Sequence, residues 1–146
     1  MQALEWGGVL HYGTQNGSRL GLFAAAANLR ELTRDNGSAF EHTWSIGESL
    51  ADGLRQIFSR TKTPAIVQNV GPMLQIMFTS VDSIDDYRDY CGHVDRSSYQ
   101  RFALSLFDQG VYMSPSAALH SVASTAHSKA DVDLTLQAVE QVLSHD

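Results

Sequence analysis

The chain has 146 residues, 43% of them hydrophobic and 18% charged, which suits one soluble globular domain or a large piece of one. Its net charge is −6 and no stretch groups several Lys or Arg residues, so the sequence argues against nucleic acid as a partner. Cys91 is the single cysteine, which excludes a disulfide framework and favours a reducing compartment. The longest apolar run is too short to span a bilayer and the N-terminus lacks a signal-peptide pattern, so we expect a cytoplasmic protein without a membrane partner.

The first part of the chain predicts two helices. Residues 1–10 carry no capping pattern, which is compatible with a natural start and also resembles a cut inside a longer protein. Residues 11–17 have the Gly, Asn and Thr content of a turn. A helix is expected from Ser18 to about Arg34, with small residues four apart that suit close packing of another backbone. After a break at residues 35–38, a second helix is expected from Ala39 to Arg60, with one buried stripe formed by Phe40, Trp44, Gly47, Leu50, Leu54 and Phe58.

The middle of the chain predicts a β-hairpin. Residues 65–70 and 73–78 read as strands, and Gly71-Pro72 between them reads as the turn. Residues 80–94 are polar and are expected to form a solvated loop.

The last third predicts two helices and two strands. A helix is expected over residues 95–109, ended by Gly110, with an apolar stripe that includes Tyr99, Phe102, Ala103, Leu106 and Phe107. Short strands are expected at residues 111–113 and 121–126. The final helix begins after a Ser128-x-x-Asp131 pattern that resembles a capping box. This order of elements predicts an α/β (α+β) fold with a small mixed or antiparallel sheet covered by helices.

Few residues suggest chemistry by themselves. The chain has no Gly-x-Ser-x-Gly elbow and no P-loop, and its acidic stretch at residues 82–89 lacks the spacing of a calcium loop. Cys91 and His93 form an isolated pair, for which a structural role is favoured over metal binding. His127 precedes a helix and is expected to make structural hydrogen bonds, whereas His11 and His120 lie in loop-like segments.

Several motifs, in order, resemble the class-III aminotransferases, a family of fold-type-I enzymes that depend on pyridoxal 5'-phosphate (PLP). The turn His11-Tyr12-Gly13-Thr14-Gln15-Asn16-Gly17 is similar to the family's Gly-Thr loop. The hairpin sequence and the tail resemble the C-terminal domain of the glutamate-1-semialdehyde aminomutases and their transaminase relatives, in Val70-Gly71-Pro72-Met73, Gly110-Val111-Tyr112-Met113-Ser114-Pro115-Ser116, Ser124-Thr125-Ala126-His127-Ser128, Asp131 and Thr135. One departure is Ala118-Leu119, which stands where the aminomutases usually have an aromatic residue followed by Glu.

The resemblance implies a division of the chain and a role for its loop. Residues 1–35 would be the end of a large domain, with the cofactor-phosphate loop and a connecting interface helix, and residues 36–146 the C-terminal small domain. Thr14 would bind the PLP phosphate of the neighbouring subunit in a homodimer, and Gly13 would allow close approach of the backbone. The catalytic groups would lie in the missing large domain, and no catalytic residue is expected in this chain.

The family's enzymes hold PLP as a Schiff base on a lysine, and Lys62 and Lys129 are the only lysines here. Neither lies in a matching motif, so the chain by itself is expected to be inactive. The parent enzyme would exchange an amino group with a small amino acid or amine, as a transaminase or as an aminomutase-like enzyme. The alternative is a non-catalytic α/β interaction module whose first helix binds another protein.

Overall fold

The computed structural model describes residues 13–144, and the expectations for residues 1–10 and for His11 lie outside the described residues. The chain divides into two compact units, residues 1–39 and residues 40–146.

The first unit contains one exposed helix. After a turn at residues 14–17, helix α2 spans Arg19–Thr33 and confirms the predicted helix. The 3₁₀ helix η1 follows at Arg34–Gly37, where Asp35, Asn36 and Gly37 all have positive φ and break the helical path. No residue of α2 is buried, and Phe23 is 76% exposed. The apolar side chains of this helix therefore have no core of their own within the described residues.

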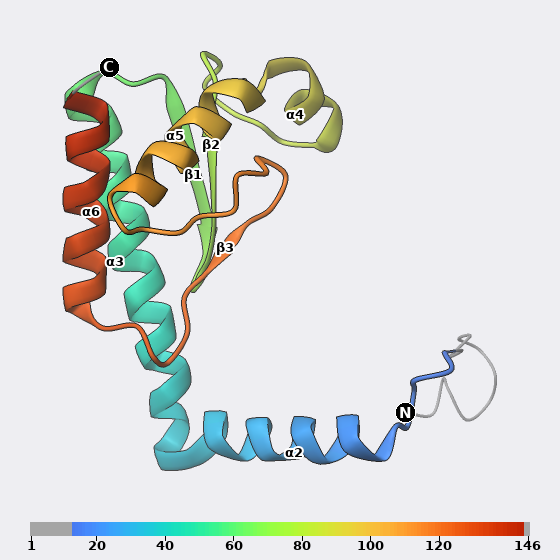
Figure 1. Cartoon of the computed structure of the whole chain (residues 1–146). Helices are drawn as coiled ribbons and strands as arrows, with labels where there is room; N and C mark the ends of the chain where they lie inside the picture. The colour runs from blue at the N-terminus through green and yellow to red at the C-terminus, as the bar shows by residue number, and fades with distance from the viewer. Residues whose placement is uncertain (1–12, 145–146) are drawn as a thin grey trace. The chain divides into compact units, whose positions relative to one another are not determined.

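The second unit contains an antiparallel sheet of three strands in the order β1-β2-β3 (Figure 1). Strands β1 (Ala65–Val70) and β2 (Met73–Phe78) form the predicted hairpin, with Val67 opposite Ile76. Strand β3 is only Ser121–Val122, so the predicted strand at residues 121–126 is shorter than expected. Residues 111–113 form no strand, which corrects that prediction. The backbone of Tyr112 and its neighbours forms no ladder of hydrogen bonds with another strand. Strand propensity alone does not make a strand, because a strand needs a neighbour to pair with.

Three helices cover one face of the sheet. They are α3 (Ser38–Thr61), α5 (Arg96–Asp108) and α6 (Lys129–Ser144), and all three confirm predicted helices. Figure 1 shows α3 and α6 side by side, and Gly53 of α3 lies against Leu136 of α6. The main core lies between these helices and the sheet, and its fully buried large side chains are Leu54, Leu106 and Val139. The result confirms the predicted fold class and selects its antiparallel form.

The buried face of α3 differs from the predicted stripe. Leu54 and Phe58 are buried as expected, but Phe40 is 50% exposed and Trp44 is 39% exposed. The rings of Phe40 and Trp44 contact each other, with 5.4 Å between centroids, and Trp44 also covers the hairpin turn at Gly71. The core positions of α3 that the stripe omitted are Thr43, Ile46, Ala51 and Ile57. The buried face of α3 is therefore rotated about the helix axis relative to the predicted stripe. At the start of the helix, Trp44 contacts the hairpin turn instead of the core.

The opposite face of the sheet is covered by residues 79–95. Met77 packs there against Ile84 and Val94 in a second, smaller core. This segment contains a short helix that the sequence reading missed, α4 (Tyr87–His93). The Asp86 carboxylate accepts hydrogen bonds from the backbone N–H groups of Arg88 and Asp89, at 2.8 and 2.9 Å, and starts α4 as an N-cap.

Candidate functional site

The Gly13–Gly17 turn is an exposed loop that leads into α2. The backbone N–H of Asn16 donates to Gly13 O at 3.0 Å, and that of Ser18 donates to Gln15 O at 3.1 Å. Gly17 has φ +82°, which favours glycine at this position. Within the described residues the Thr14 hydroxyl makes no hydrogen bond, so it is free to bind a group from outside this part of the chain.

Among the described residues, no side chain caps the backbone donors at the N-terminus of α2. The Ser18 side chain makes no capping hydrogen bond, and no acidic residue lies in the first turn. Arg19 stands at the first helical position instead, where its charge opposes the positive end of the helix dipole. Free N–H groups, the dipole and an arginine together favour a bound anion, and phosphate commonly binds at helix N-termini. The sequence does not single out Ser18 or Arg19 as candidate anion-binding residues, because one serine and one arginine in a turn are ordinary.

The two lysines lie far along the chain from the loop, at the ends of helices in the second unit. Lys62 has φ +57° just after α3, and Lys129 is the first residue of α6. Both residues are exposed. Lys62 lines an open depression between α3 and β1 whose other lining residues include Phe58 and Ala65.

The pair Cys91 and His93 lies exposed on α4. Among the described residues, no three His, Cys, Asp or Glu side chains come close enough together to hold a metal ion. The described residues therefore place no further potential metal ligand beside Cys91 and His93.

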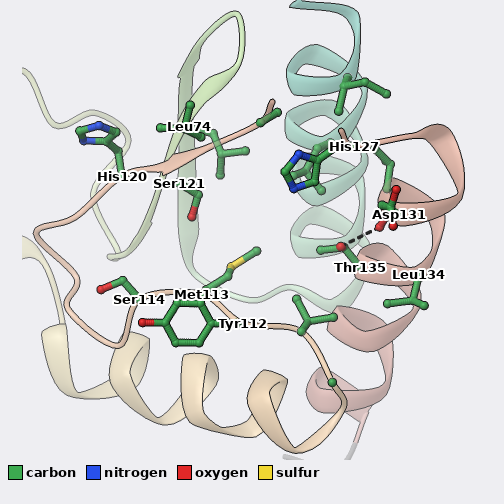
Figure 2. Close-up of a pocket in the computed structure, with 17 residues that line it drawn as sticks. Leu74, Tyr112, Met113, Ser114, His120, Ser121, His127, Asp131, Leu134 and Thr135 are labelled. Atoms are coloured by element: carbon green, nitrogen blue, oxygen red, sulfur yellow. Dashed lines mark hydrogen bonds between the residues drawn. The ribbon is translucent and has the colours of Figure 1, made fainter. Parts of the chain in front are cut away.

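His127 makes the structural hydrogen bonds expected of it. Its Nδ1 accepts from the Ser124 backbone N–H at 3.0 Å, and its carbonyl oxygen lies 2.8 Å from Nε2 of His42 on α3. These contacts hold the turn before α6 against α3. His120 and His127 both line a pocket beside β3, and Figure 2 shows them well apart from each other.

A pocket of about 440 Å³ lies in the second unit, between β3, residues 110–114 and the first turns of α6. Figure 2 shows Tyr112 and Met113 facing Ser121 across this space. The floor is apolar and includes the buried side chains of Leu74, Met113 and Val132. The lining residues come from five segments, which are α3, β2, residues 110–114, residues 120–123 and the start of α6. Several of them belong to the tail motifs of the sequence, but those motifs by themselves do not indicate a pocket.

Asp131 stands at the wall of this pocket as part of the predicted capping box. Its Oδ2 accepts from the Ser128 hydroxyl at 2.7 Å and from the Ser128 backbone N–H at 2.8 Å. The hydroxyl bond, followed by the backbone bond, lowers the pKa of the Asp131 carboxyl below its ordinary value. The capping box is thus formed with Asp in the place of the usual Glu.

No helix in residues 13–144 is long and apolar enough to cross a membrane. Thr14 belongs to the first unit, whereas the histidines and lysines among the described residues all belong to the second. The candidate site in the first unit is the exposed Gly13–Gly17 turn together with the backbone N–H groups at the start of α2. The second unit contains the hydrophobic core and the pocket beside β3.

Comparison with curated proteins finds relatives that match most of the chain. The chain is 34% identical over 134 residues to the glutamate-1-semialdehyde 2,1-aminomutase of Chloroflexus aggregans, covering 90% of this chain and 31% of that protein. It is 36% identical over 130 residues to the same enzyme of Chloroflexus aurantiacus, covering 88% of this chain and 29% of that protein. The chain thus spans less than a third of the length of these relatives. No family model matches the sequence.

Comparison with solved structures finds the same fold in PLP-type aminotransferases. A β-phenylalanine aminotransferase from Variovorax paradoxus matches with a TM-score of 0.74 at 22% identity, covering 94% of this chain and 30% of that one. An omega-transaminase from Sphaerobacter thermophilus matches with a TM-score of 0.72 at 22% identity, over 93% of this chain and 30% of that one. A glutamate-1-semialdehyde aminomutase from Pseudomonas aeruginosa, in complex with PMP, matches with a TM-score of 0.66 at 18% identity, over 73% and 23%.

Proposed function

We propose that this chain, a homologue of the C-terminal part of the class-III, fold-type-I aminotransferases, belongs to an enzyme that exchanges an amino group between PLP and a small amino acid or amine. The observation that carries this proposal is the identity of 34–36% with the aminomutases over about nine-tenths of the chain. Residues 1–35 would close the large domain and residues 36–146 would form the small domain. The enzyme would be a homodimer in the cytoplasm.

In this proposal Gly13 and Thr14 bind the phosphate of PLP held by the neighbouring subunit. The Thr14 hydroxyl is exposed and makes no hydrogen bond in the described part of the chain, so it can donate to a phosphate oxygen. The uncapped N-terminus of α2 adds backbone donors, and Arg19 adds a positive charge. These groups suit a phosphate dianion, and they would orient the cofactor without taking part in the transfer.

When bound, PLP supplies the electron sink for breaking a bond next to the amino group. The residues of this chain would contribute binding and positioning only. Lys62 and Lys129 are both exposed at helix ends, and neither lies in a segment that resembles the family's cofactor-attachment motif. We therefore expect the 146-residue chain to hold no PLP covalently.

The first experiment is PLP absorbance with borohydride trapping on the purified 146-residue chain, followed by mass analysis of its peptides. No stoichiometric adduct is the expected result, since the attachment lysine would lie in the large domain. A double variant, Lys62→Ala with Lys129→Ala, controls for non-specific labelling of surface amines. A stoichiometric adduct on either lysine, absent from the double variant, would mean that this chain has its own cofactor site.

The reaction type of the complete enzyme stays open between a transaminase and an aminomutase-like enzyme. Ala118 and Leu119 supply no carboxylate where the aminomutases usually have Glu, which favours transfer to a second substrate. The test is amino transfer to a keto acid by the complete enzyme, compared with isomerisation of glutamate 1-semialdehyde. Isomerisation without transfer would contradict the transaminase reading.

A non-catalytic interaction module is the second candidate, and one observation favours it. Large apolar side chains of α2 are exposed, at 82% for Leu20, 76% for Phe23 and 61% for Leu29. Such a surface suits any protein partner, including the missing large domain. If the gene encodes no larger protein and the chain binds an unrelated partner through α2, the module is the correct reading.

A further inference from the structure

The outer edge of β3 carries free backbone hydrogen-bonding groups. Ser121 pairs with Leu74 and Val122 pairs with Met73 in antiparallel register, and the Ala123 N–H donates to Pro72 O at 2.8 Å. Hydrogen-bonded and non-hydrogen-bonded pairs alternate along such a ladder, so Val122 occupies a non-hydrogen-bonded position. Its N–H and C=O therefore point away from β2, toward the open side of the sheet.

The pocket of about 440 Å³ lies directly beside this edge, on the face of the sheet that carries the main core. Ser121 shares that face with its partner Leu74, which is only 2% exposed and forms part of the floor. Across the pocket, residues 110–114 run without a strand partner of their own. Figure 2 shows the space between Ser121 and this segment. A side chain that entered here would meet the core itself.

The pocket also presents one directed polar group. Because Nδ1 of His127 accepts a hydrogen bond from the Ser124 backbone N–H, the neutral ring carries its proton on Nε2. Within the described residues this Nε2 makes no hydrogen bond, and His127 lines the pocket. It can donate to a carbonyl oxygen of a chain that lies along the edge.

We propose that an extended segment of the parent chain pairs with the outer edge of β3 as a fourth strand and places an apolar side chain in this pocket. The proposal rests on the proposed function, because the segment belongs to the part of the enzyme that this chain does not contain. The relatives are more than three times as long as the matched region, so most of such an enzyme lies outside these 146 residues. An N–H and a C=O on one residue of an edge strand match an extended backbone, and strand addition at sheet edges is a common mode of recognition.

The length of β3 adds a physical reason. A strand of two residues is weakly held by one neighbour alone, and an exposed sheet edge is usually paired, covered or charged. Val122 is 55% exposed and carries no charge, and its backbone N–H and C=O make no hydrogen bond among the described residues. A fourth strand would protect the edge and would convert the open pocket into core.

The test is hydrogen exchange in the complete enzyme, resolved at the Val122 amide, with Val122→Pro and Val122→Thr as matched variants. We expect the wild-type amide to exchange at least about 100-fold more slowly than an unprotected amide, since only a hydrogen-bonded amide is protected to this degree. Val122→Pro removes the outward N–H but leaves the bonds of Ser121 and Ala123 to β2, whereas Val122→Thr keeps every backbone donor. The proline variant should speed exchange in the pairing segment by about tenfold, the equivalent of one lost hydrogen bond, and the threonine variant should not.

The outcomes separate this proposal from the one on which it rests. An unprotected Val122 amide in an enzyme that binds PLP overturns the fourth strand and leaves the proposed function in place. Protection that disappears when the enzyme is diluted to monomers assigns the edge to a second copy, which also overturns it. If the gene encodes no larger protein, or the complete protein binds no PLP, the proposed function falls and the fourth strand falls with it.

Discussion

Gly47 of α3 lies directly against the carbonyl of Gly71 in the hairpin turn, and a Cβ built at residue 47 would stand 2.2 Å from Gly71 O. This contact lets the backbone of the helix touch the backbone of the turn. Gly71 itself has φ +51° and lies under the ring of Trp44, so the turn is fixed from the same helix. The α3–hairpin contact therefore depends on glycine in both partners.

Gly47→Ala should destabilise the second unit. The added methyl group collides with backbone that cannot rotate away, and overpacking of this kind costs about 1–3 kcal/mol, of which helix propensity returns about 1 kcal/mol. We expect a net loss of up to about 2 kcal/mol in the free energy of unfolding, measured by urea unfolding of the chain. Gly92→Ala is the control, because nothing lies within 4 Å of a Cβ at that position in α4. Equal stability of the two variants would contradict the close contact.

Thr14→Ala in the complete enzyme should weaken retention of PLP. Loss of a hydrogen bond to a charged phosphate costs about 1.5–3 kcal/mol, which corresponds to roughly 10- to 100-fold weaker binding. Thr14→Ser keeps the hydroxyl and should retain most of the affinity. The measurement is the dissociation constant of PLP from the apoenzyme, and an unchanged value in the alanine variant would remove the role proposed for Thr14.

Arg55→Ala should expose the edge of β1. The guanidinium donates to Val67 O from Nε at 3.2 Å and from Nη2 at 3.0 Å, and it also bonds Asn69 and Asp52. Because the side chain is 41% exposed, we expect a loss of only about 1 kcal/mol in the free energy of unfolding.

Arg55→Lys should not restore this stability, since an ammonium group cannot donate in the same fork. Arg88→Ala controls for loss of a positive charge, because the Arg88 side chain makes no hydrogen bond or ion pair in the described residues. An unchanged free energy of unfolding in the Arg55→Ala variant would show that the edge of β1 does not need this arginine.

The capping box at α6 predicts a dependence of stability on acid. Ser128 lowers the pKa of the Asp131 carboxyl in the folded chain, so the carboxylate contributes stability above its unfolded pKa. That contribution is lost as the pH falls through the lowered folded value. Ser128→Ala should raise the pKa of Asp131 toward its ordinary value, as measured by NMR titration of the carboxyl carbon, and should flatten the pH dependence of unfolding between about pH 2 and 5.

Asp133→Asn serves as the control for this prediction, because the Asp133 carboxylate makes no hydrogen bond in the described residues. It should leave the acid dependence unchanged, whereas Asp131→Asn should remove the same part of it as Ser128→Ala. An Asp131 pKa that does not move in the Ser128 variant would refute the assigned cause.

Local patterns in the sequence determined α2, α3, α5 and α6, the hairpin and the capping box, but not the short helix α4. The β-hairpin at residues 65–78 and the start of α6 follow from alternation, a Gly-Pro turn and a cap, all of which act over a few residues. The same locality explains the Gly13-Thr14 resemblance, which is a short contiguous motif. Its role stays a prediction, since the residues it would serve belong to another part of the enzyme.

Only the tertiary structure decided which surfaces are buried and which edges are free. Trp44 matches the helical stripe of α3 yet contacts the hairpin turn, and residues 111–113 have strand propensity but no partner. The pocket beside β3 and the outward N–H of Val122 depend on register between segments almost fifty residues apart. Burial and strand pairing each need two segments that contact each other. A sequence pattern describes one of these segments and does not identify the other.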